Sequence, residues 1–247
     1  AGCPNDCSRT EFLVFMLKIN NVSKSFAGLL AVDQCSFAIR EGTISALIGP
    51  NGAGKSTLFN CISRIYPVDS GEIYYAKNRL DLLPPHRIAR LGIGRSFQLT
   101  RTLDHLSVTE NLALHTAGGF GSHLLQRGVT PNDKQRADEI MEFLGISALA
   151  DLDMGSLSYG QKKLLDLGAV LMADPDLILL DEPAAGVNLR LLENIIEKLV
   201  ALKEQGKTIL LVEHNMDVVM GVSDDVIVMS AGRIIATGKP SAIQNNP

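Results

Sequence analysis

A glycine-rich segment at residues 49–56 constrains the fold of this chain more than any other feature. It matches the pattern G-x-x-x-x-G-K-[ST] and consists of Gly49, Pro50, Asn51, Gly52, Ala53, Gly54, Lys55 and Ser56. The segment 44–48 before it predicts a short buried strand, and the segment 57–62 after it predicts a helix. A strand, a glycine loop and a helix in this order are the context in which the pattern forms a phosphate-binding loop.

Elementary chemistry explains why such a loop needs these residue types. Glycines allow backbone N–H groups to converge on phosphate oxygens, and the N-terminus of the following helix adds partial positive charge. Lys55 can reach the β- and γ-phosphates, and the hydroxyl of Ser56 can bind Mg²⁺. A chance match occurs on the order of once in a hundred chains of this length. We therefore predict that residues 49–57, which end at Thr57, bind a nucleotide. GTPases, kinases, motors and transport ATPases all remain open at this point.

Composition narrows the class of protein. The chain has 247 residues, of which 46% are hydrophobic and 20% charged, as is ordinary for a globular protein. The net charge of −4 gives no basic footprint, so we predict no nucleic-acid partner. The longest apolar run, 12–17, is far shorter than the roughly 20 residues that span a bilayer. A role at a membrane therefore requires a partner protein.

The cysteines indicate the redox compartment of the protein, and the first residues indicate where its domain begins. Because no C-x-x-C pair occurs, we interpret the four cysteines as reduced thiols of a cytosolic protein: Cys3, Cys7, Cys35 and Cys61. A metal or disulfide site at Cys3 and Cys7 is the less favoured alternative. Residues 1–15 fit the later pattern poorly, and we predict a poorly ordered leader or appended extension there. Residues 16–247 are then expected to form a single domain.

Hydrophobic patterning predicts an α/β fold. Continuous apolar runs, typical of strands buried on both faces, occur at 44–48, 177–180 and 208–212. They alternate with helical patterns, which implies a mainly parallel sheet covered by helices on both faces. Three further segments, 16–20, 31–39 and 71–75, predict an antiparallel β layer beside the glycine loop. The segment 226–236 predicts a late hairpin.

The middle of the chain changes to helical spacing. Thr130 and Pro131 predict the start of a helix, Ile140, Met141 and Leu144 share its apolar face, and Gly145 ends it. We predict a helical subdomain, at about 99–172, inserted into the core. Later in the chain, Asn188 is expected to cap a helix whose leucines and isoleucines pack in the core.

Two acids follow the predicted strand at 177–180. Carboxylates at the C-terminal end of a buried parallel strand lie where ligands meet such sheets. We predict that Asp181 holds Mg²⁺ or its water shell and that Glu182 acts as general base on the attacking water. A strand that ends in solvated acids is common by itself, but the glycine loop favours the functional interpretation.

A third motif indicates the family. Residues 157–161 read Leu-Ser-Tyr-Gly-Gln at the start of a helix, where Ser158 and the N–H groups around Gly160 predict a second anion site. The run resembles the LSGGQ signature of ABC-type ATPases, and it lies in the expected order between the glycine loop and Asp181. The resemblance extends from Met16 onward. It implies a P-loop NTPase of the ABC-ATPase type, with an antiparallel β subdomain and an inserted helical subdomain.

The resemblance also implies roles for single residues. Gln98 matches a glutamine that contacts Mg²⁺ or the water and senses the membrane partner, and His214 matches the switch histidine that contacts the γ-phosphate. Phe26 occupies the position of an aromatic residue that stacks on adenine. The implied catalytic set is Glu182, His214, Gln98 and Lys55, and the implied metal ligands are Ser56, Gln98 and Asp181. In the loop 183–188, Asn188 stands where many relatives have Asp.

Within the family, the chain most resembles the ATPase subunits of branched-chain amino acid importers. Tyr159 and the runs 28–32, 181–188 and 212–217 carry this likeness, whereas the segment 118–128 is short for this branch. The implied protein binds Mg·ATP and pairs head to tail with an identical or related second ATPase subunit. In that dimer Ser158, Gly160 and Gln161 bind the nucleotide of the other subunit.

The same resemblance implies the partners and the location. Hydrolysis of ATP would drive import through an integral membrane permease, with a solute-binding protein acting indirectly. The protein would be cytoplasmic and peripheral, on the inner face of the cell membrane. An ABC transporter for another solute, a soluble ABC-type nucleotide switch and a P-loop kinase are the alternatives.

Overall fold

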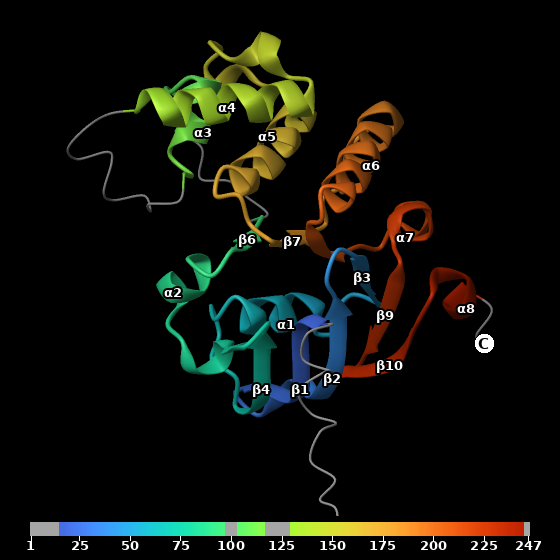
Figure 1. Ribbon diagram of the computed structural model, residues 1–247. Coiled ribbons are helices and arrows are strands. Elements are labelled where there is room, and N and C mark those ends of the chain that lie inside the picture. Colours follow the sequence, from blue (N-terminus) through green and yellow to red (C-terminus); the bar gives the residue numbers. More distant parts are fainter. Residues whose placement is uncertain (1–14, 97–102, 117–128, 245–247) are drawn as a thin grey trace, which may run out of the picture.

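Two β sheets organise the protein in the computed structural model, which describes residues 15–96, 103–116 and 129–244 (Figure 1). The larger sheet has the strand order β10-β9-β3-β8-β7-β6 and the smaller has the order β2-β1-β4-β5. The strands of the larger sheet are β3 (Ile44–Ile48), β6 (Ile93–Arg95), β7 (Leu177–Asp181), β8 (Thr208–Val212), β9 (Asp225–Ser230) and β10 (Arg233–Gly238).

The larger sheet is parallel except at one edge. β3 pairs in parallel with β8 and β9, and β7 pairs in parallel with β8 and β6. Only the pairing of β9 with β10 is antiparallel among the pairs described in this sheet, and it forms the predicted late hairpin. Every residue of β3, β7 and β8 is buried, as parallel strands covered on both faces require. The predicted parallel core is therefore confirmed.

The alternation of side chains along these strands separates two cores. Ile44, Ala46 and Ile48 of β3 point into one core, and Leu47 points into the other. The first core is covered by α5 (Tyr159–Leu171), α6 (Leu189–Glu204) and α7 (Met216–Val222). The second core lies under α1 (Lys55–Ile62) and the smaller sheet. In Figure 1 these two groups lie on opposite sides of the larger sheet.

The smaller sheet is antiparallel throughout, as the sequence predicts. Its strands are β1 (Phe15–Phe26), β2 (Leu29–Arg40), β4 (Ser70–Tyr75) and β5 (Asn78–Arg79). β1 is longer than the predicted segment 16–20, because its pairing with β2 continues through several register shifts. Asn21 and Gln34 adopt left-handed backbone conformations at these irregularities, which interrupts the side-chain alternation that a sequence pattern displays.

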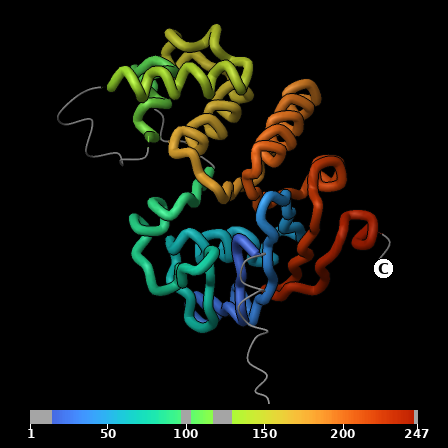
Figure 2. The backbone as a smooth tube through the Cα atoms, viewed as in Figure 1, coloured from blue at the N-terminus to red at the C-terminus, as the bar shows by residue number. Residues whose placement is uncertain are grey.

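Helices from the middle of the chain gather at one end of the molecule (Figure 2). They are α3 (Val108–Ala113), α4 (Pro131–Leu144) and α5. The side chain of Thr130 caps α4, Gly145 ends it at a φ of 72°, and its buried face includes Ile140, Met141 and Leu144, as predicted. The limits of about 99–172 for a helical subdomain stay a prediction. Short elements complete the described fold: α2 (Pro85–Ala89), α8 (Pro240–Gln244) and 3₁₀ turns at Leu80–Leu82, Ser147–Leu149 and Met154–Ser156.

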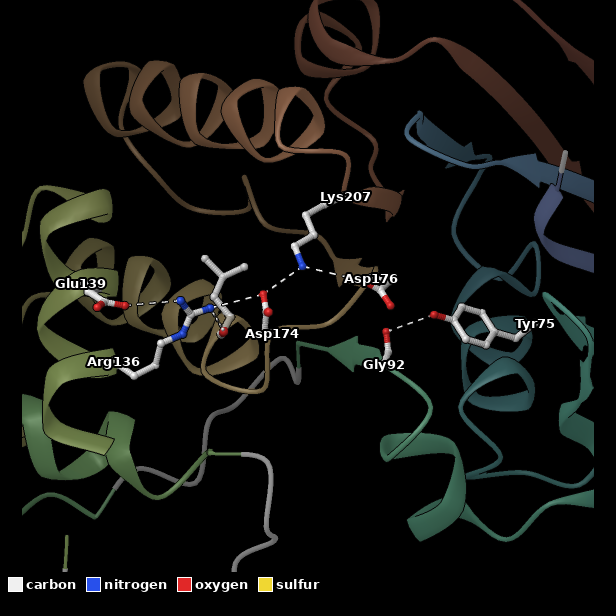
Figure 3. A network of polar contacts seen from close by, with 8 residues as sticks. Tyr75, Gly92, Arg136, Glu139, Asp174, Asp176 and Lys207 are labelled. Atoms are coloured by element: carbon white, nitrogen blue, oxygen red, sulfur yellow. Dashed lines mark hydrogen bonds and ion pairs between the residues drawn. The ribbon is translucent and has the colours of Figure 1, made fainter. Parts of the chain in front are cut away.

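An ion-pair network joins the helical end to the amino edge of the larger sheet (Figure 3). Asp174, in the connection from α5 to β7, contacts Arg136 of α4 at 3.3 Å and Lys207 at 2.9 Å. Lys207 precedes β8, and these cations lower the pKa of Asp174, Lys207 most strongly. The network therefore lies opposite the carboxyl edge of the sheet, where the strands deliver the predicted functional residues.

The described residues can be searched for membrane-spanning helices and for the state of the cysteines. No helix among them is both long and apolar enough to cross a bilayer. Cys35 and Cys61 are free and buried, and burial raises the pKa of Cys61 to about 11. Cys3, Cys7 and the short segment 118–128 lie outside the described residues.

Candidate functional site

The glycine loop connects β3 to α1 and depends on two glycines that no other residue can replace without a clash. A Cβ atom at Gly49 would lie 2.0 Å from the carbonyl oxygen of Met229, and one at Gly54 would lie 2.2 Å from that of Ala31. Both glycines have positive φ angles, of 151° and 102°. Tight contact with β2 and β9 therefore fixes the path of the loop.

The N-terminus of α1 differs from those of the other long helices. Among the described α-helices of eight or more residues, α4, α5 and α6 are capped by the side chains of Thr130, Ser158 and Asn188. α1 instead follows Gly54, has no side-chain cap and has no acidic residue in its first turn. Its positive end has no side-chain cap from within the described chain, which leaves its N–H groups available to an external anion.

Lys55 folds back over this loop. Its side chain is largely buried, and its ammonium donates to the carbonyl oxygens of Gly49 and Pro50 at 2.7 and 3.0 Å. Both acceptors are neutral, so phosphate oxygens can compete for the same ammonium. Ser56 is exposed and Thr57 is partly buried on the next positions of α1.

Asp181 ends β7 in a largely buried position. Its backbone N–H donates to the hydroxyl of Ser96 at 3.1 Å, which joins β7 to the end of β6. Burial raises the pKa of its carboxyl, while the charges of Arg95, Lys163 and Lys55 oppose that rise. The Oδ1 atom is buried and has no hydrogen-bond partner among the described residues. An orphaned carboxylate oxygen fits a hard cation such as Mg²⁺, for which the hydroxyl of Ser56 is a second oxygen donor.

Glu182 and His214 lie side by side at the carboxyl edge of the sheet. The Oε1 atom of Glu182 is 3.6 Å from Nδ1 of His214. Glu182 has a φ of 50°, unusual for a residue with a side chain. Its N–H donates to the carbonyl of Val212 at 3.0 Å, and its own carbonyl accepts from Lys163 at 3.2 Å. These bonds hold the strained residue in place.

The residues of the Leu-Ser-Tyr-Gly-Gln run lie at the start of α5, beside α6. Ser158 and Gln161 form a reciprocal cap at the start of α5, and a Cβ atom at Gly160 would lie 2.5 Å from Leu191 of α6. The phenol of Tyr159 donates to the carbonyl of Ala185 at 3.3 Å. These residues line an open groove of about 670 Å³ together with residues 186–188 and α6. None of the residues that line the groove belongs to the glycine loop.

Phe26 and Gln98 are the two predicted site residues that remain. Phe26 ends β1, is 39% exposed and packs edge to face on Tyr66, with ring centroids 5.1 Å apart. The ammonium of Lys24 also lies over this ring, 5.4 Å from its centroid. A partly exposed aromatic ring of this kind can stack on a nucleobase. Gln98 lies outside the described residues.

Sequence reasoning missed three residues that support the site. Ser96 and Lys163 bond to the backbones of Asp181 and Glu182, and Glu213 is a buried acid that directly precedes His214. Each of the three lies within four residues of a predicted site residue, and this proximity in sequence was the only indication of a role in the site. Their type gave no further indication, since Ser, Lys and Glu in such positions are usually solvated.

Comparison with known proteins gives a family match and a similar protein of named function. Residues 32–185 match the model of the family described as ABC transporter. A probable branched-chain amino acid transport ATP-binding protein, LivG of Archaeoglobus fulgidus, is 38% identical over 238 residues, which cover 94% of this chain and 92% of the relative.

Two solved structures resemble the fold. A nucleotide-free ATP-binding cassette from an ABC transporter superposes with a TM-score of 0.86 at 33% identity and covers 94% of this chain and 96% of that one. A dimeric ATP-binding cassette bound to ADP and phosphate in a post-hydrolysis state has a TM-score of 0.79 at 26% identity, with coverage of 91% and 99%.

Proposed function

The chain belongs to the ABC transporter family, and we propose that it is the ATP-binding and ATP-hydrolysing subunit of an importer for branched-chain amino acids. One observation carries this proposal: the uncapped N-terminus of α1, with Lys55 folded over it, lies at the carboxyl edge that also carries Asp181, Glu182 and His214. The names of the similar LivG proteins support the choice of solute.

ATP binding follows from the groups at this edge. The backbone N–H groups of residues 49–57, other than Pro50, which has none, receive the phosphates. Lys55 exchanges its two carbonyl acceptors for oxygens of the β- and γ-phosphates. Phe26 stacks on adenine. Ser56, Asp181 and Gln98 would hold Mg²⁺, which supplies charge neutralisation of the phosphate oxygens when bound.

Hydrolysis requires a base and a group that holds the γ-phosphate. Glu182 accepts the proton of the water that attacks the γ-phosphorus, as the bond to the bridging oxygen breaks and ADP leaves with that oxygen. His214, whose Nδ1 lies 3.6 Å from the carboxylate of Glu182, orients the γ-phosphate and the base together. The products are ADP and phosphate.

The groove at α5 supports a dimer in which each site is shared. Ser158, Gly160 and Gln161 lie at the N-terminus of α5, in a groove whose lining includes no residue of the glycine loop. We infer that they bind the γ-phosphate of ATP held by a second subunit, identical or related, placed head to tail. A similar cassette is described as dimeric. The dimer would act at the cytoplasmic face of a membrane permease that receives its solute from a binding protein.

Replacing Glu182 with Gln tests the assignment of the base. The amide keeps the size of the side chain and cannot accept the proton, so ATP affinity should stay near that of the wild type while turnover falls at least 100-fold. Size-exclusion chromatography with Mg·ATP should then show a persistent dimer. Glu142→Gln, an exposed position on α4, is the matched control. Rapid turnover by Glu182→Gln would refute the assignment of Glu182 as the base. Transfer of the γ-phosphate to an acceptor other than water would indicate a kinase.

Uptake measurements test the solute. Cells of the source organism that carry Glu182→Gln in place of the wild type should lose import of labelled leucine, isoleucine and valine. Import of an unrelated sugar should be unchanged. Normal uptake of all three amino acids would contradict the proposed solute and leave the ATPase assignment intact.

A further inference from the structure

We propose that Glu213 is a positioning residue for hydrolysis, whose carboxylate holds the loop that follows Glu182 against the loop that carries His214. This inference rests on the proposed function of Glu182 and His214. Glu213 follows β8 directly and is only 1% exposed, although glutamate is rarely buried without a partner.

Three backbone N–H groups from two separate loops donate to this one carboxylate. Ala184 donates to Oε1 at 2.9 Å, and His214 and Asn215 donate to Oε2 at 3.1 and 3.3 Å. The backbone of Glu213 is itself fixed, since its N–H reaches the carbonyl of Leu47 in β3 at 3.4 Å. The side chain therefore bridges the carboxyl ends of β7 and β8 from a fixed point of the sheet.

The bridge ends next to both proposed reacting groups. Ala184 lies two residues after Glu182, and His214 is the residue that follows Glu213. The 3.6 Å separation between Glu182 and His214 thus depends on two loops that share one acceptor group. Glu182 is also strained, with a φ of 50°, so the loop after it needs external bonds to keep its conformation.

The charge and number of oxygens of Glu213 match its three donors. An ionised carboxylate accepts through both oxygens, and hydrogen bonds to a charged acceptor are stronger than neutral ones. A glutamine has the same shape but one acceptor, and its NH₂ group would face a backbone N–H of one of the two loops. Glu213→Gln should therefore release one loop from the other without creating a cavity.

Kinetics of Glu213→Gln and of a matched control test the proposal. Asp81→Asn is the control, because Asp81 is also a buried carboxylate that accepts a backbone N–H, from Ile73 at 3.0 Å, but it lies beside the smaller sheet. We expect Glu213→Gln to lower kcat for ATP 10- to 100-fold while the equilibrium affinity for Mg·ATP stays within twofold. Asp81→Asn should lower the unfolding midpoint and leave kcat unchanged.

A double-mutant cycle separates positioning from general destabilisation. In a His214→Ala background, Glu213→Gln should lower single-turnover phosphate release by less than threefold, because the placement of Glu182 against the His214 side chain, which Glu213 maintains, is already lost. Wild-type kcat in Glu213→Gln, an equal loss in both backgrounds, or a parallel loss of ATP affinity would each overturn the inference.

Two further comparisons keep the result decisive. If Glu213→Gln does not fold, Glu213→Asp, which keeps the charge but retracts the carboxylate by one methylene, must show the same separation of kcat from affinity. Failure of the wild-type protein to hydrolyse ATP would refute the proposed function itself. Hydrolysis by the wild type with no effect at Glu213 would refute only this inference.

Discussion

Replacing Asp166 with Asn should stabilise the protein at neutral and alkaline pH and change its stability little at acidic pH. Asp166 lies on α5, and its Oδ1 atom is buried without a hydrogen-bond partner in the described part of the chain. It borders a cavity of about 10 Å³ between α3 and α5, at the lower limit for one water molecule. Burial raises the pKa of this carboxyl to about 7, although Lys163 opposes the rise.

The size and the sign of the effect follow from this pKa. Below pH 3.8, the ordinary value for aspartate, the carboxyl is protonated in the folded and the unfolded chain and contributes nothing. Between that value and pH 7 the unfolded chain releases the proton first, so the free energy of unfolding falls as the pH rises. Above pH 7 the penalty is constant, at no more than about 4 kcal/mol. Asparagine does not titrate, so it removes this dependence.

Urea denaturation of the nucleotide-free protein between pH 4 and pH 9 measures the effect. Far-ultraviolet circular dichroism is the suitable probe, since the chain has no tryptophan. Asp166→Asn should gain stability over the wild type as the pH rises from 4 to 7, and Asp138→Asn, exposed on α4, should show no such gain. An unchanged difference between Asp166→Asn and the wild type across this range would refute the reasoning.

Substitutions at the nucleotide site give two more expectations. Gly54→Ala forces a contact of 2.2 Å with Ala31, whereas a Cβ atom at Gly52 meets nothing within 4 Å. Urea titrations should show a loss of about 1–2 kcal/mol for Gly52→Ala from its positive φ alone, and a clearly larger loss for Gly54→Ala; equal losses would contradict the clash. Phe26→Ala should weaken ATP binding by about 1–3 kcal/mol in calorimetry and leave inorganic tripolyphosphate binding unchanged. A parallel loss for both ligands would exclude adenine stacking on Phe26.

The strands of the larger sheet could be predicted closely because their environment is uniform. Segments 44–48 and 208–212 are buried along their whole length, and the structure places β3 and β8 at these same residues. The extent of β1 could not be predicted, since its irregular pairing with β2 around Asn21 breaks the period of two. Helix starts were predictable where a cap is local in sequence, as at Thr130 and Asn188.

The candidate site was predictable only where the chemistry is local. The glycine pattern indicates a phosphate loop, but the atoms that require glycine at 49 and 54 belong to Met229 and Ala31, which are distant in sequence. Glu213 and Asp166 have the residue type of a solvated surface, and only the packing of other segments buries the side chain of Glu213 and the Oδ1 atom of Asp166. A sequence shows which groups can ionise, whereas the tertiary structure decides which of them lose water.

Charged side chains are paired at the amino edge of the larger sheet and incompletely paired at its carboxyl edge. At the amino edge, Asp174 is paired with two cations, so its charge is compensated within the chain. At the carboxyl edge, the Oδ1 atom of Asp181 has no hydrogen-bond partner in the described chain, and Lys55 contacts only neutral carbonyl oxygens. Arg95, Lys163 and Lys55 offset the charge of Asp181 only in part, since none of them donates a hydrogen bond to its Oδ1 atom. Charged groups that are incompletely satisfied in this way reduce the stability of the nucleotide-free protein. Phosphates and Mg²⁺ would compensate both, so nucleotide binding should stabilise the fold through the groups that the nucleotide-free protein leaves incompletely satisfied.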